Sequence, residues 1–307
     1  MSDIAGALGP VFLLILFGVL LRRIGFPGES FWPQAERLTY YVLFPAMLIY
    51  KLAIADVGNT PLLPTLVSIL FMLLGGSTLL YLLRRQVASN GPAFTSVFQG
   101  GIRFNTYIGM ACADALYGDA GLVAAAVVVA IMIPLVNLLC VLSFHLTLHR
   151  GNLGPFSVFK SLVSNPLILG CLVGIALNQT GIGLPGWSKN TFALLGSAAL
   201  PLGLLAVGVA LEIRAIHGAW KELISASLFR FLLLPLLMLA AIHWLTPPLL
   251  NSQVLLLFAS LPTASSAYIL ARQLGGDTTL MANTITVQTL AGFAFTSFWL
   301  VLAQSFL

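Results

Sequence analysis

Charged side chains are scarce in this sequence of 307 residues. Asp, Glu, Lys and Arg together make up 7% of the chain, whereas hydrophobic residues make up 59%. A water-soluble protein carries about 25% charged residues, because charged groups cover the surface that faces water. The 9 acidic and 14 basic side chains present here cannot cover a folded chain of this length. The scarcity of charge therefore excludes a soluble protein and indicates that the solvent of this chain is largely lipid.

The residue clusters that enzymes use are also missing. The three cysteines, Cys112, Cys140 and Cys171, lie inside apolar stretches and show neither the spacing of metal ligands nor a paired pattern. The four histidines fall near the ends of apolar segments, and no group of His, Cys and carboxylate residues suits a metal site or a catalytic dyad. The sequence also has no phosphate-binding Gly-Lys loop. We therefore expect neither an enzyme nor a bound cofactor.

Long apolar segments fill most of the chain. A helix needs roughly 20 apolar residues to cross a bilayer, and ten segments approach or exceed this length. They are residues 5–22, 32–53, 61–83, 92–117, 120–146, 157–178, 188–212, 219–245, 250–273 and 278–305. Short loops with glycine, proline or charged residues separate them. The sequence predicts an all-α integral membrane protein with ten transmembrane helices.

Basic residues are distributed unequally between the two ends of these segments. One end carries Arg22, Arg23, Arg37, Arg84, Arg85, Arg150, Lys160, Arg214, Lys221 and Arg272, whereas the other carries Lys51 and Lys189. The positive-inside rule places the first group in the cytoplasm. We therefore expect a multi-pass protein of the plasma membrane with both termini outside. The net charge of +5 then reflects this orientation and does not indicate binding to nucleic acid.

The two halves of the sequence repeat each other. At an offset of 156, Pro10, Gly18 and Pro45 match Pro166, Gly174 and Pro201, and at an offset of 158, Gly118-Asp119 matches Gly276-Asp277. Each half, 1–150 and 151–307, contains five of the expected spans. Because five is odd, the second half must enter the membrane from the opposite side. Inverted repeats of this kind are frequent in secondary transporters, whose binding sites lie between the repeats near the midplane.

The fourth and ninth spans hold equivalent places in the two repeats, and both contain residues that interrupt helices. The fourth contains Gly100-Gly101 and then Asn105-Thr106, and the ninth contains Pro262 followed by Thr263. Glycine and proline disfavour a continuous helix, and Asn or Thr can cap a new one. We expect the two broken helices to cross. Each break would present a helix N-terminus, which carries about half a positive charge and unpaired N–H groups.

Two such helix ends favour a small anion, and Arg103 adds a full positive charge close by. A charge at this depth is expensive unless it has a partner, a cavity or a function. We predict a carboxylate-binding cavity lined by Arg103, Asn105, Thr106, Pro262, Thr263, Ser265 and Ser266. In the alternative interpretation, the glycines and Pro262 are ordinary kinks and Arg103 pairs with Asp114.

Other polar residues lie inside spans. Asn137, Asn283, Thr286 and Gln288 either contact the substrate or a coupling ion, or hold helices together. Arg230, five residues before Pro235, either snorkels or pairs, and the sequence does not decide between these roles.

Several motifs resemble the auxin efflux carrier family over nearly the whole chain. They are Gly9-Pro10 through Gly18, Arg22-Arg23, Pro45, Asn165-Pro166, Leu184-Pro185, Ala199-Leu200-Pro201-Leu202, Gly208 and Leu261-Pro262. Asn105-Thr106 is similar to the Asn-Thr that follows a proline in plant members, although Phe104 stands in the place of that proline here. The family includes plant auxin exporters and bacterial carriers of malonate or other organic acids.

The resemblance implies a ten-helix fold shared with bile-acid sodium symporters. Helices 1, 2, 6 and 7 would form a scaffold domain, and helices 3–5 and 8–10 a transport domain in which helices 4 and 9 cross. Transport would proceed by an elevator-like movement of one domain against the other. The resemblance also implies a homodimer.

Together these inferences predict a secondary transporter of small organic anions such as auxin-like or malonate-like carboxylates, in the direction of export. An interior-negative potential drives a monoanion outward by about 2.3 kcal/mol per 100 mV, so export needs no coupling ion. The alternative is a symporter coupled to sodium or protons, with the ion held by Asn137, Asn283 or Gln288. A membrane sensor that transports nothing would need a signalling domain, which the sequence does not show.

Overall fold

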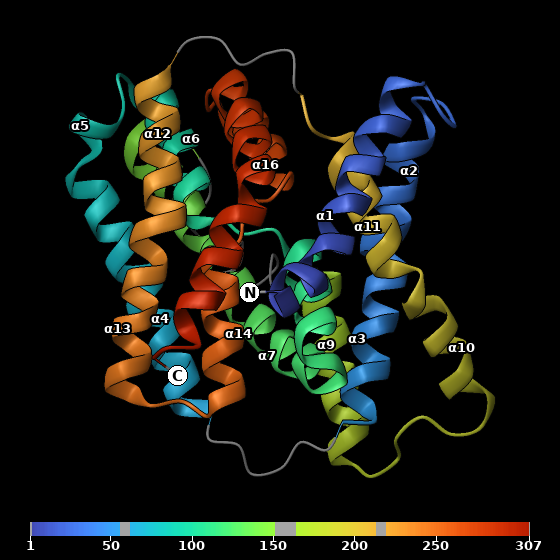
Figure 1. The fold of residues 1–307 in the computed structure, drawn as a ribbon. Helices are drawn as coiled ribbons and strands as arrows, with labels where there is room; N and C mark the ends of the chain where they lie inside the picture. Colours follow the sequence, from blue (N-terminus) through green and yellow to red (C-terminus); the bar gives the residue numbers. More distant parts are fainter. Residues whose placement is uncertain (1, 56–61, 151–163, 213–218, 307) are drawn as a thin grey trace.

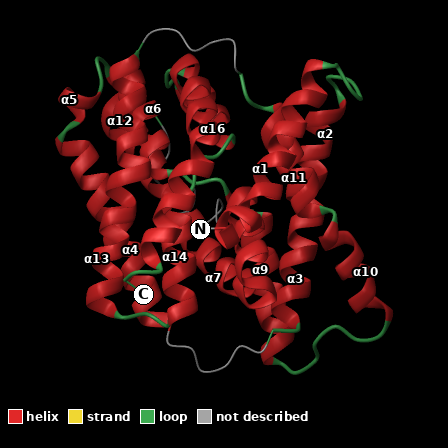
Figure 2. Ribbon diagram, in the orientation of Figure 1, coloured by secondary structure: helices red, strands yellow, loops and turns green. Residues whose placement is uncertain are grey.

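The computed structural model describes residues 2–55, 62–150, 164–212 and 219–306, and these residues form helices joined by loops, without any strand among them (Figure 2). Six helical segments of this described part are long and apolar enough to cross a membrane, namely Ile4–Arg23, Leu62–Leu82, Gly91–Leu148, Trp187–Val209, Trp220–Leu245 and Thr278–Ala303. The prediction of an all-α, multi-pass membrane protein is confirmed. The count of ten spans and the inverted repeat stay predictions.

Residues 2–55 and 62–150 form eight elements. They are α1 (Ser2–Arg23), α2 (Phe31–Leu38), the wide π-helical turn η1 (Thr39–Leu43), α3 (Phe44–Ala53), α4 (Leu62–Leu82), α5 (Arg84–Val87), α6 (Gly91–Ile102) and α7 (Thr106–Leu148). The long element α7 is in fact two helices, because Gly118 lies outside the helical region with φ 60° and ψ −150°. A side chain would strain this backbone conformation, so the reversal at Gly118 depends on glycine.

The described residues of the second half form nine elements, seen in Figure 1 from the green-yellow to the red end of the chain. They are α9 (Pro166–Gln179), α10 (Trp187–Ser197), α11 (Ala199–Val209), α12 (Trp220–Leu228), the turn η3 (Phe229–Leu233), α13 (Leu234–Leu245), α14 (Leu249–Ser260), α15 (Ser266–Leu274) and α16 (Thr278–Ala303). Lys160 and Arg214, which contribute to the predicted orientation, lie outside the described residues.

Proline explains the two wide turns. Pro45 and Pro235 each lie at the second position of the helix that follows η1 or η3. Proline has no N–H, so the carbonyl four residues earlier loses its helical partner. For Pro235 that carbonyl belongs to Phe231, and the indole Nε1 of Trp299 in α16 donates to it at 2.6 Å. The freed carbonyl therefore ties α16 to η3 inside the apolar interior.

The helices form two groups in Figure 1. On the right, α1 packs against α11, and α3 packs against α9 and α10. On the left, α13 packs against α4, and α12 packs against α6. Element α7 contacts α1, α3 and α11 of the first group and α4, α6 and α14 of the second. The two groups thus meet along α7, which begins at the break in the fourth predicted span, and also where α1 contacts α16.

Glycine allows α1 and α11 to pack backbone against backbone. A Cβ placed on Gly208 of α11 would lie 1.9 Å from the carbonyl oxygen of Ile15, and a Cβ on Gly18 of α1 would lie 2.3 Å from that of Leu205. Both distances are far shorter than any van der Waals contact. Only glycine fits at these two positions without displacing a helix.

Replacing Gly208 with alanine is therefore expected to destabilise the protein. Overpacking a filled interior costs about 1–3 kcal/mol, and the clash here is with backbone that cannot rotate away. Thermal unfolding in detergent would measure the effect. The control is Gly6→Ala in α1, where nothing lies within 4 Å of the new Cβ, and its unfolding temperature should stay at or above that of the wild type. Equal unfolding temperatures for Gly208→Ala and the wild type would contradict the close packing of α1 and α11.

Candidate functional site

Two interrupted helices cross and touch. Helix α6 ends at Ile102 and α7 begins at Thr106, while α14 ends at Ser260 and α15 begins at Ser266. The backbone N–H of Asn105 donates to the carbonyl oxygen of Pro262 at 2.9 Å. Both helices are thus interrupted where the sequence predicts, and the two interruptions are bonded to each other. The alternative that these are ordinary kinks is wrong.

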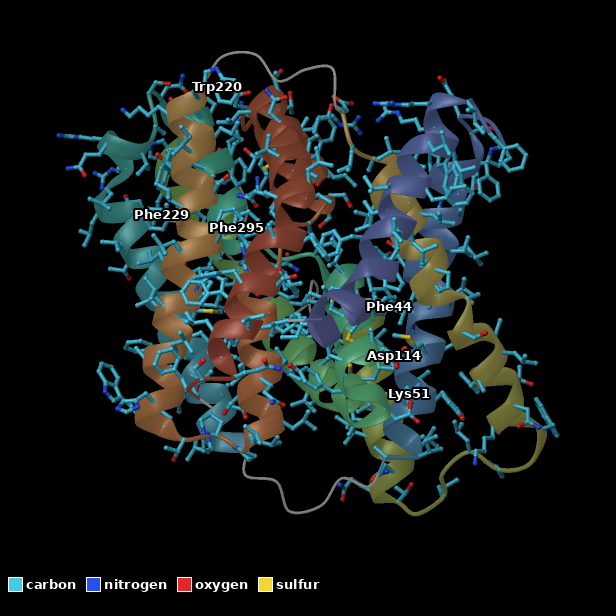
Figure 3. All side chains as sticks on the ribbon, in the orientation of Figure 1. Phe44, Lys51, Asp114, Trp220, Phe229 and Phe295 are labelled. Carbon is cyan, nitrogen blue, oxygen red and sulfur yellow. The ribbon has the colours of Figure 1, made fainter. Side chains whose placement is uncertain are left out.

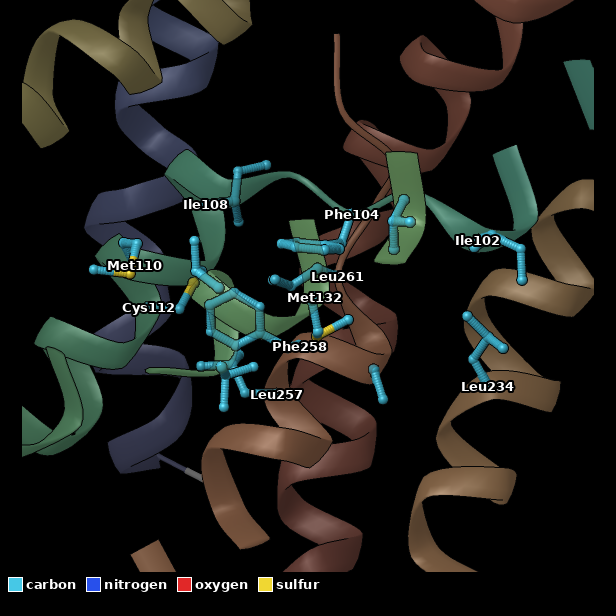
Figure 4. Close-up of a cluster of buried hydrophobic side chains, with 14 of the residues drawn as sticks. Ile102, Phe104, Ile108, Met110, Cys112, Met132, Leu234, Leu257, Phe258 and Leu261 are labelled. Atoms are coloured by element: carbon cyan, nitrogen blue, oxygen red, sulfur yellow. The ribbon is translucent and has the colours of Figure 1, made fainter. Parts of the chain in front are cut away.

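The first interruption forms without a proline. Arg103 is extended at φ −71° and ψ 154°, a conformation that residues before proline also adopt. The side-chain oxygen of Asn105 accepts from the N–H of Ile108 at 3.2 Å and so caps α7. Phe104 is buried with its ring edge-to-face against Phe258 at a centroid distance of 5.5 Å, within the apolar cluster of Figure 4. The asparagine cap and the buried phenylalanine together hold this break open.

Contacts with α6 and α16 stabilise the second interruption. Pro262 packs against α16 where Gly292 leaves room, since a Cβ there would lie 3.1 Å from the proline ring. The hydroxyl of Thr263 donates to the carbonyl oxygen of Gln99 at 3.4 Å. Ser265 precedes α15 without a side-chain capping bond. Thr263 is fully buried, whereas Ser265 is half-buried and Ser266 exposed.

Gln288 of α16 joins the two interruptions. Its side-chain oxygen accepts from the N–H of Thr263 at 3.1 Å, and its side-chain nitrogen donates to the carbonyl oxygen of Gly100 at 3.1 Å. The residue is completely buried. We expected Gln288 to contact the substrate or a coupling ion, or to hold helices together, and its two hydrogen bonds fit the last of these roles.

Arg230 of η3 holds the other side of the crossing, a role that the sequence left undecided. It is completely buried and makes five hydrogen bonds, all to backbone carbonyl groups. The acceptors are Leu261 at 2.5 Å, Phe258 at 2.6 Å, Ala259 at 2.7 Å, and Ile102 and Arg103 at 3.3 Å each. These carbonyls belong to the last turns of α6 and α14 and the residues just beyond them. One guanidinium group thus satisfies the C-terminal ends of both interrupted helices.

Arg103 points away from this carbonyl cluster. Its Nη2 donates to the hydroxyl of Ser266 at 3.2 Å, but its Nε and Nη1 are buried and have no hydrogen-bond partner among the described residues. The guanidinium also lies close enough to Tyr40 to interact with it electrostatically, and close enough to the thiol of Cys140 for a weak side-chain hydrogen bond. Arg103 therefore retains donors that a bound group could use.

The predicted alternative partner of Arg103 is elsewhere. Asp114 interacts electrostatically with Lys51, and the two side chains lie near each other in Figure 3. Lys51 forms an ion pair with Asp119, the only one recorded within the described ranges. The alternative interpretation in which Arg103 pairs with Asp114 is therefore wrong.

Unpaired backbone donors are found at the two helix starts next to Arg103, one following it in sequence and one bearing its partner Ser266. The N–H groups of Thr106 and Tyr107 at the start of α7, and of Ser265 and Ser266 at the start of α15, form no hydrogen bond within the described part of the chain. The hydroxyl of Tyr107, which sequence reasoning missed although it directly follows Asn105-Thr106, is buried and also unpaired there. Helix N-termini attract negative charge. This side of the crossing therefore has the chemistry of an anion site.

Known proteins that are similar to this chain are described as transporters. The family described as "Membrane transport protein" matches residues 153–300. The match covers 148 of the 307 residues of the chain. The chain is 26% identical over 328 residues to a Rhizobium meliloti protein named "Putative malonate transporter", covering 99% of this chain and 97% of the relative. It is 25% identical over 296 residues, 95% of both chains, to a Methanothermobacter thermautotrophicus protein named "Uncharacterized transporter". The resemblance to the auxin efflux carrier family is confirmed, and the protein is a transporter, not an enzyme.

The other polar residues predicted to contact substrate or ion form no hydrogen bond with the two interruptions among the described residues. Thr286 accepts from the backbone N–H of Glu212 at 3.0 Å and so links α16 to the segment that follows α11. Asn283 is buried, and its side-chain oxygen has no partner among the described residues. Asn137 lies half-buried in α7, and its side chain has no hydrogen bond to another described residue.

A cavity of about 440 Å³ lies between α1, α3, α7 and the α10–α11 segment of the transporter. Its lining is mostly apolar, with Lys51, Asp114 and Ser197 among the polar exceptions. Asp114 follows Thr106 by eight residues, which places it about 12 Å along α7 from the crossing at 1.5 Å per residue. None of the predicted site residues lines this cavity. It is separate from the donors around Arg103.

Replacing Gln288 with leucine is expected to destabilise the transporter, because the N–H of Thr263 and the carbonyl of Gly100 would lose their partner. A buried polar group left unpaired costs about 1–3 kcal/mol. Thermal unfolding in detergent measures the loss. The matched control is Gln253→Leu in α14, a half-buried glutamine whose side chain has no recorded hydrogen bond. If both variants unfold at the same temperature, Gln288 does not join the two interruptions.

Proposed function

We propose that this protein is a secondary transporter of small organic anions, with carboxylates as substrates. The observation that carries the proposal is the position of Arg103, whose unpartnered Nε and Nη1 lie beside the uncapped start of α15 and the start of α7. A carboxylate accepts hydrogen bonds at both oxygens and suits a guanidinium group together with helix N–H donors. The relative named "Putative malonate transporter" supports a carboxylate substrate.

In this proposal the carboxylate binds between the two helix starts. Arg103, Thr106, Ser265 and Ser266 contact it through their free donors, and the hydroxyl of Tyr107 adds one more. We assign a structural role to three other predicted residues, Asn105, Pro262 and Thr263. Their polar groups already form hydrogen bonds within the crossing, and they shape the site without contacting the substrate. Asn283 and Asn137 stay candidates for a second contact with substrate or ion.

We propose that ten spans form two inverted repeats, residues 1–150 and 151–307, with both termini outside the plasma membrane. The matching helices α6 and α14 support this arrangement. Each has 12 residues, and α14 begins 158 positions after α6, the same offset that aligns Gly118-Asp119 with Gly276-Asp277. Asp277 caps the start of α16 in the second half. At the equivalent place in the first half, the second helix of α7 begins after Gly118.

The two groups of helices in Figure 1 support a division into a scaffold and a transport domain that move past each other as in an elevator. The scaffold would contain α1, α2, α3, α9, α10 and α11, and the transport domain the other helices. Tyr107 of α7 lies at their contact, since its ring occupies the space beside Gly203 of α11 and meets Phe44 of α3 edge-to-face at 5.2 Å. A homodimer through the scaffold belongs to the same proposal.

The proposed direction is export without a coupling ion. The membrane potential favours the outward movement of an anion by about 2.3 kcal/mol per charge and 100 mV. Coupled symport with sodium or protons is the competing mechanism, and the experiment below separates the two.

Purified protein in liposomes is expected to carry labelled malonate, and a panel of other monocarboxylates and dicarboxylates should define the preferred substrate. A potassium diffusion potential, a proton gradient and a sodium gradient are imposed separately. Flux that follows the potential alone supports the uniporter, whereas flux that requires a sodium or proton gradient supports the symporter. Protein-free liposomes set the background, and an absence of flux for every carboxylate would refute the proposed function.

Replacing Arg103 with glutamine is expected to reduce malonate transport by about 10- to 100-fold, because a hydrogen bond to a charged group is worth about 1.5–3 kcal/mol. The variant should unfold at nearly the wild-type temperature, since Arg103 makes one side-chain hydrogen bond to an oxygen atom in the free protein. Arg37→Gln in α2, an exposed arginine, is the control and should transport normally. Unchanged transport by Arg103→Gln would show that Arg103 does not bind the substrate.

A further inference from the structure

The interior arginine Arg230 has a distinctive set of partners. Its exposed fraction is 0%, and each of its five recorded hydrogen bonds ends on a main-chain carbonyl oxygen. A guanidinium group has five N–H donors, one on Nε and two on each Nη. Here Nε makes one bond, Nη1 two and Nη2 two. Every donor of Arg230 is therefore used, and no carboxylate within the described residues pairs with it.

The charges of this cluster balance. The C-terminal end of a helix carries about half a negative charge, so the ends of α6 and α14 together offset about one positive charge. The guanidinium supplies that charge from η3, a third element. The guanidinium is completely buried and fills the space beside these carbonyl groups in the wild type. Arg230 thus neutralises the C-terminal side of the crossing and leaves the N-terminal side electropositive.

Interrupted helices in other transporters use the same kind of carbonyl cluster differently. There, unwound carbonyl groups and the C-terminal ends of half-helices coordinate the coupling sodium ion or proton. In this protein the corresponding carbonyls of Phe258, Ala259 and Leu261 already accept hydrogen bonds from Arg230. A metal cation at this cluster would have to displace those bonds and would meet a positive charge at close range.

We propose that Arg230 is a tethered cation that occupies the place of a coupling ion at the crossing, so that the protein transports its anion independently of sodium. This inference rests on the proposed function. Arg230 acts as a positioning residue, because it touches no substrate in this arrangement. It fixes the ends of α6 and α14 relative to each other, and hence the positions of Arg103 and the helix starts that face the anion.

The decisive experiment compares the wild type with Arg230→Met in liposomes that contain labelled malonate, in sodium, choline or dilute guanidinium chloride at equal ionic strength. Wild-type flux should be the same in sodium and choline. Flux through Arg230→Met should fall by about 10- to 100-fold, the size expected when a hydrogen-bonded charge is lost. Guanidinium or sodium, which can enter the vacated space beside the carbonyls, should restore part of it. A purely architectural arginine would not make the variant respond to these cations.

Two further variants complete the design. Arg230→Lys keeps the charge with fewer donors and should transport at an intermediate rate, and it replaces Arg230→Met if that variant does not fold. Arg85→Gln changes an exposed arginine in the short helix α5 and should match the wild type in every solution. Should neither Arg230 variant fold, the sodium comparison on the wild type decides alone.

Thermal unfolding provides a readout that does not depend on the substrate. Sodium should leave the wild-type unfolding temperature unchanged, whereas dilute guanidinium should raise that of Arg230→Met. If no carboxylate is transported, the proposed function fails while this measurement still tests Arg230. The inference is overturned if sodium raises wild-type flux by about 5-fold or more, the lower end of typical coupling between ligands. It is equally overturned if sodium stabilises the wild type, or if Arg230→Met transports and unfolds like the wild type.

Discussion

The structure depends on how the backbone groups freed at two helix interruptions are satisfied inside an apolar protein. In lipid, a carbonyl or N–H group without a partner costs several kcal/mol, so interruptions persist only where other protein groups replace the missing helical bonds. Arg230 supplies five donors to the carbonyl ends, Gln288 bonds to both interruptions, and Asn105 bonds directly to Pro262. Among the residues that the structure describes, the replacement is incomplete on one side, where the N–H groups at the starts of α7 and α15 have no partner.

This asymmetry gives the crossing its chemical character. Negative helix ends face one arginine and are neutralised, whereas positive helix ends face a second arginine, Arg103, that still has unused donors. Arg230 and Arg103, which both lie at the crossing, therefore have different roles. One completes the backbone, and the other is available to a ligand. An anion completes the charge balance of the second side, as the guanidinium of Arg230 does for the first.

Packing distinguishes contacts within the two helix groups from contacts between them. Within the first group, Gly18 and Gly208 bring the backbones of α1 and α11 together so closely that relative movement would produce clashes. Between the groups, Tyr107 meets Phe44 and the space beside Gly203 through an aromatic side chain. Side-chain contacts of this kind can be exchanged as bodies slide, whereas interlocked backbones cannot. The internal rigidity of each group and the softer boundary along α7 are compatible with movement as two bodies.

Local properties of the sequence determined the membrane class, the helical segments, the family and the positions of both interruptions, because apolar length, glycine pairs, proline and asparagine caps act over a few residues. The break at Phe104 could be located without its proline for the same reason. Only the tertiary structure decided what Arg230 does, since its acceptors lie 28 to 128 positions away, and Gln288 reaches 188 positions to Gly100. Asp114, near in sequence to Arg103, proved to face Lys51 instead. Such partners depend on which helices pack together, and a single sequence carries no signal for that choice.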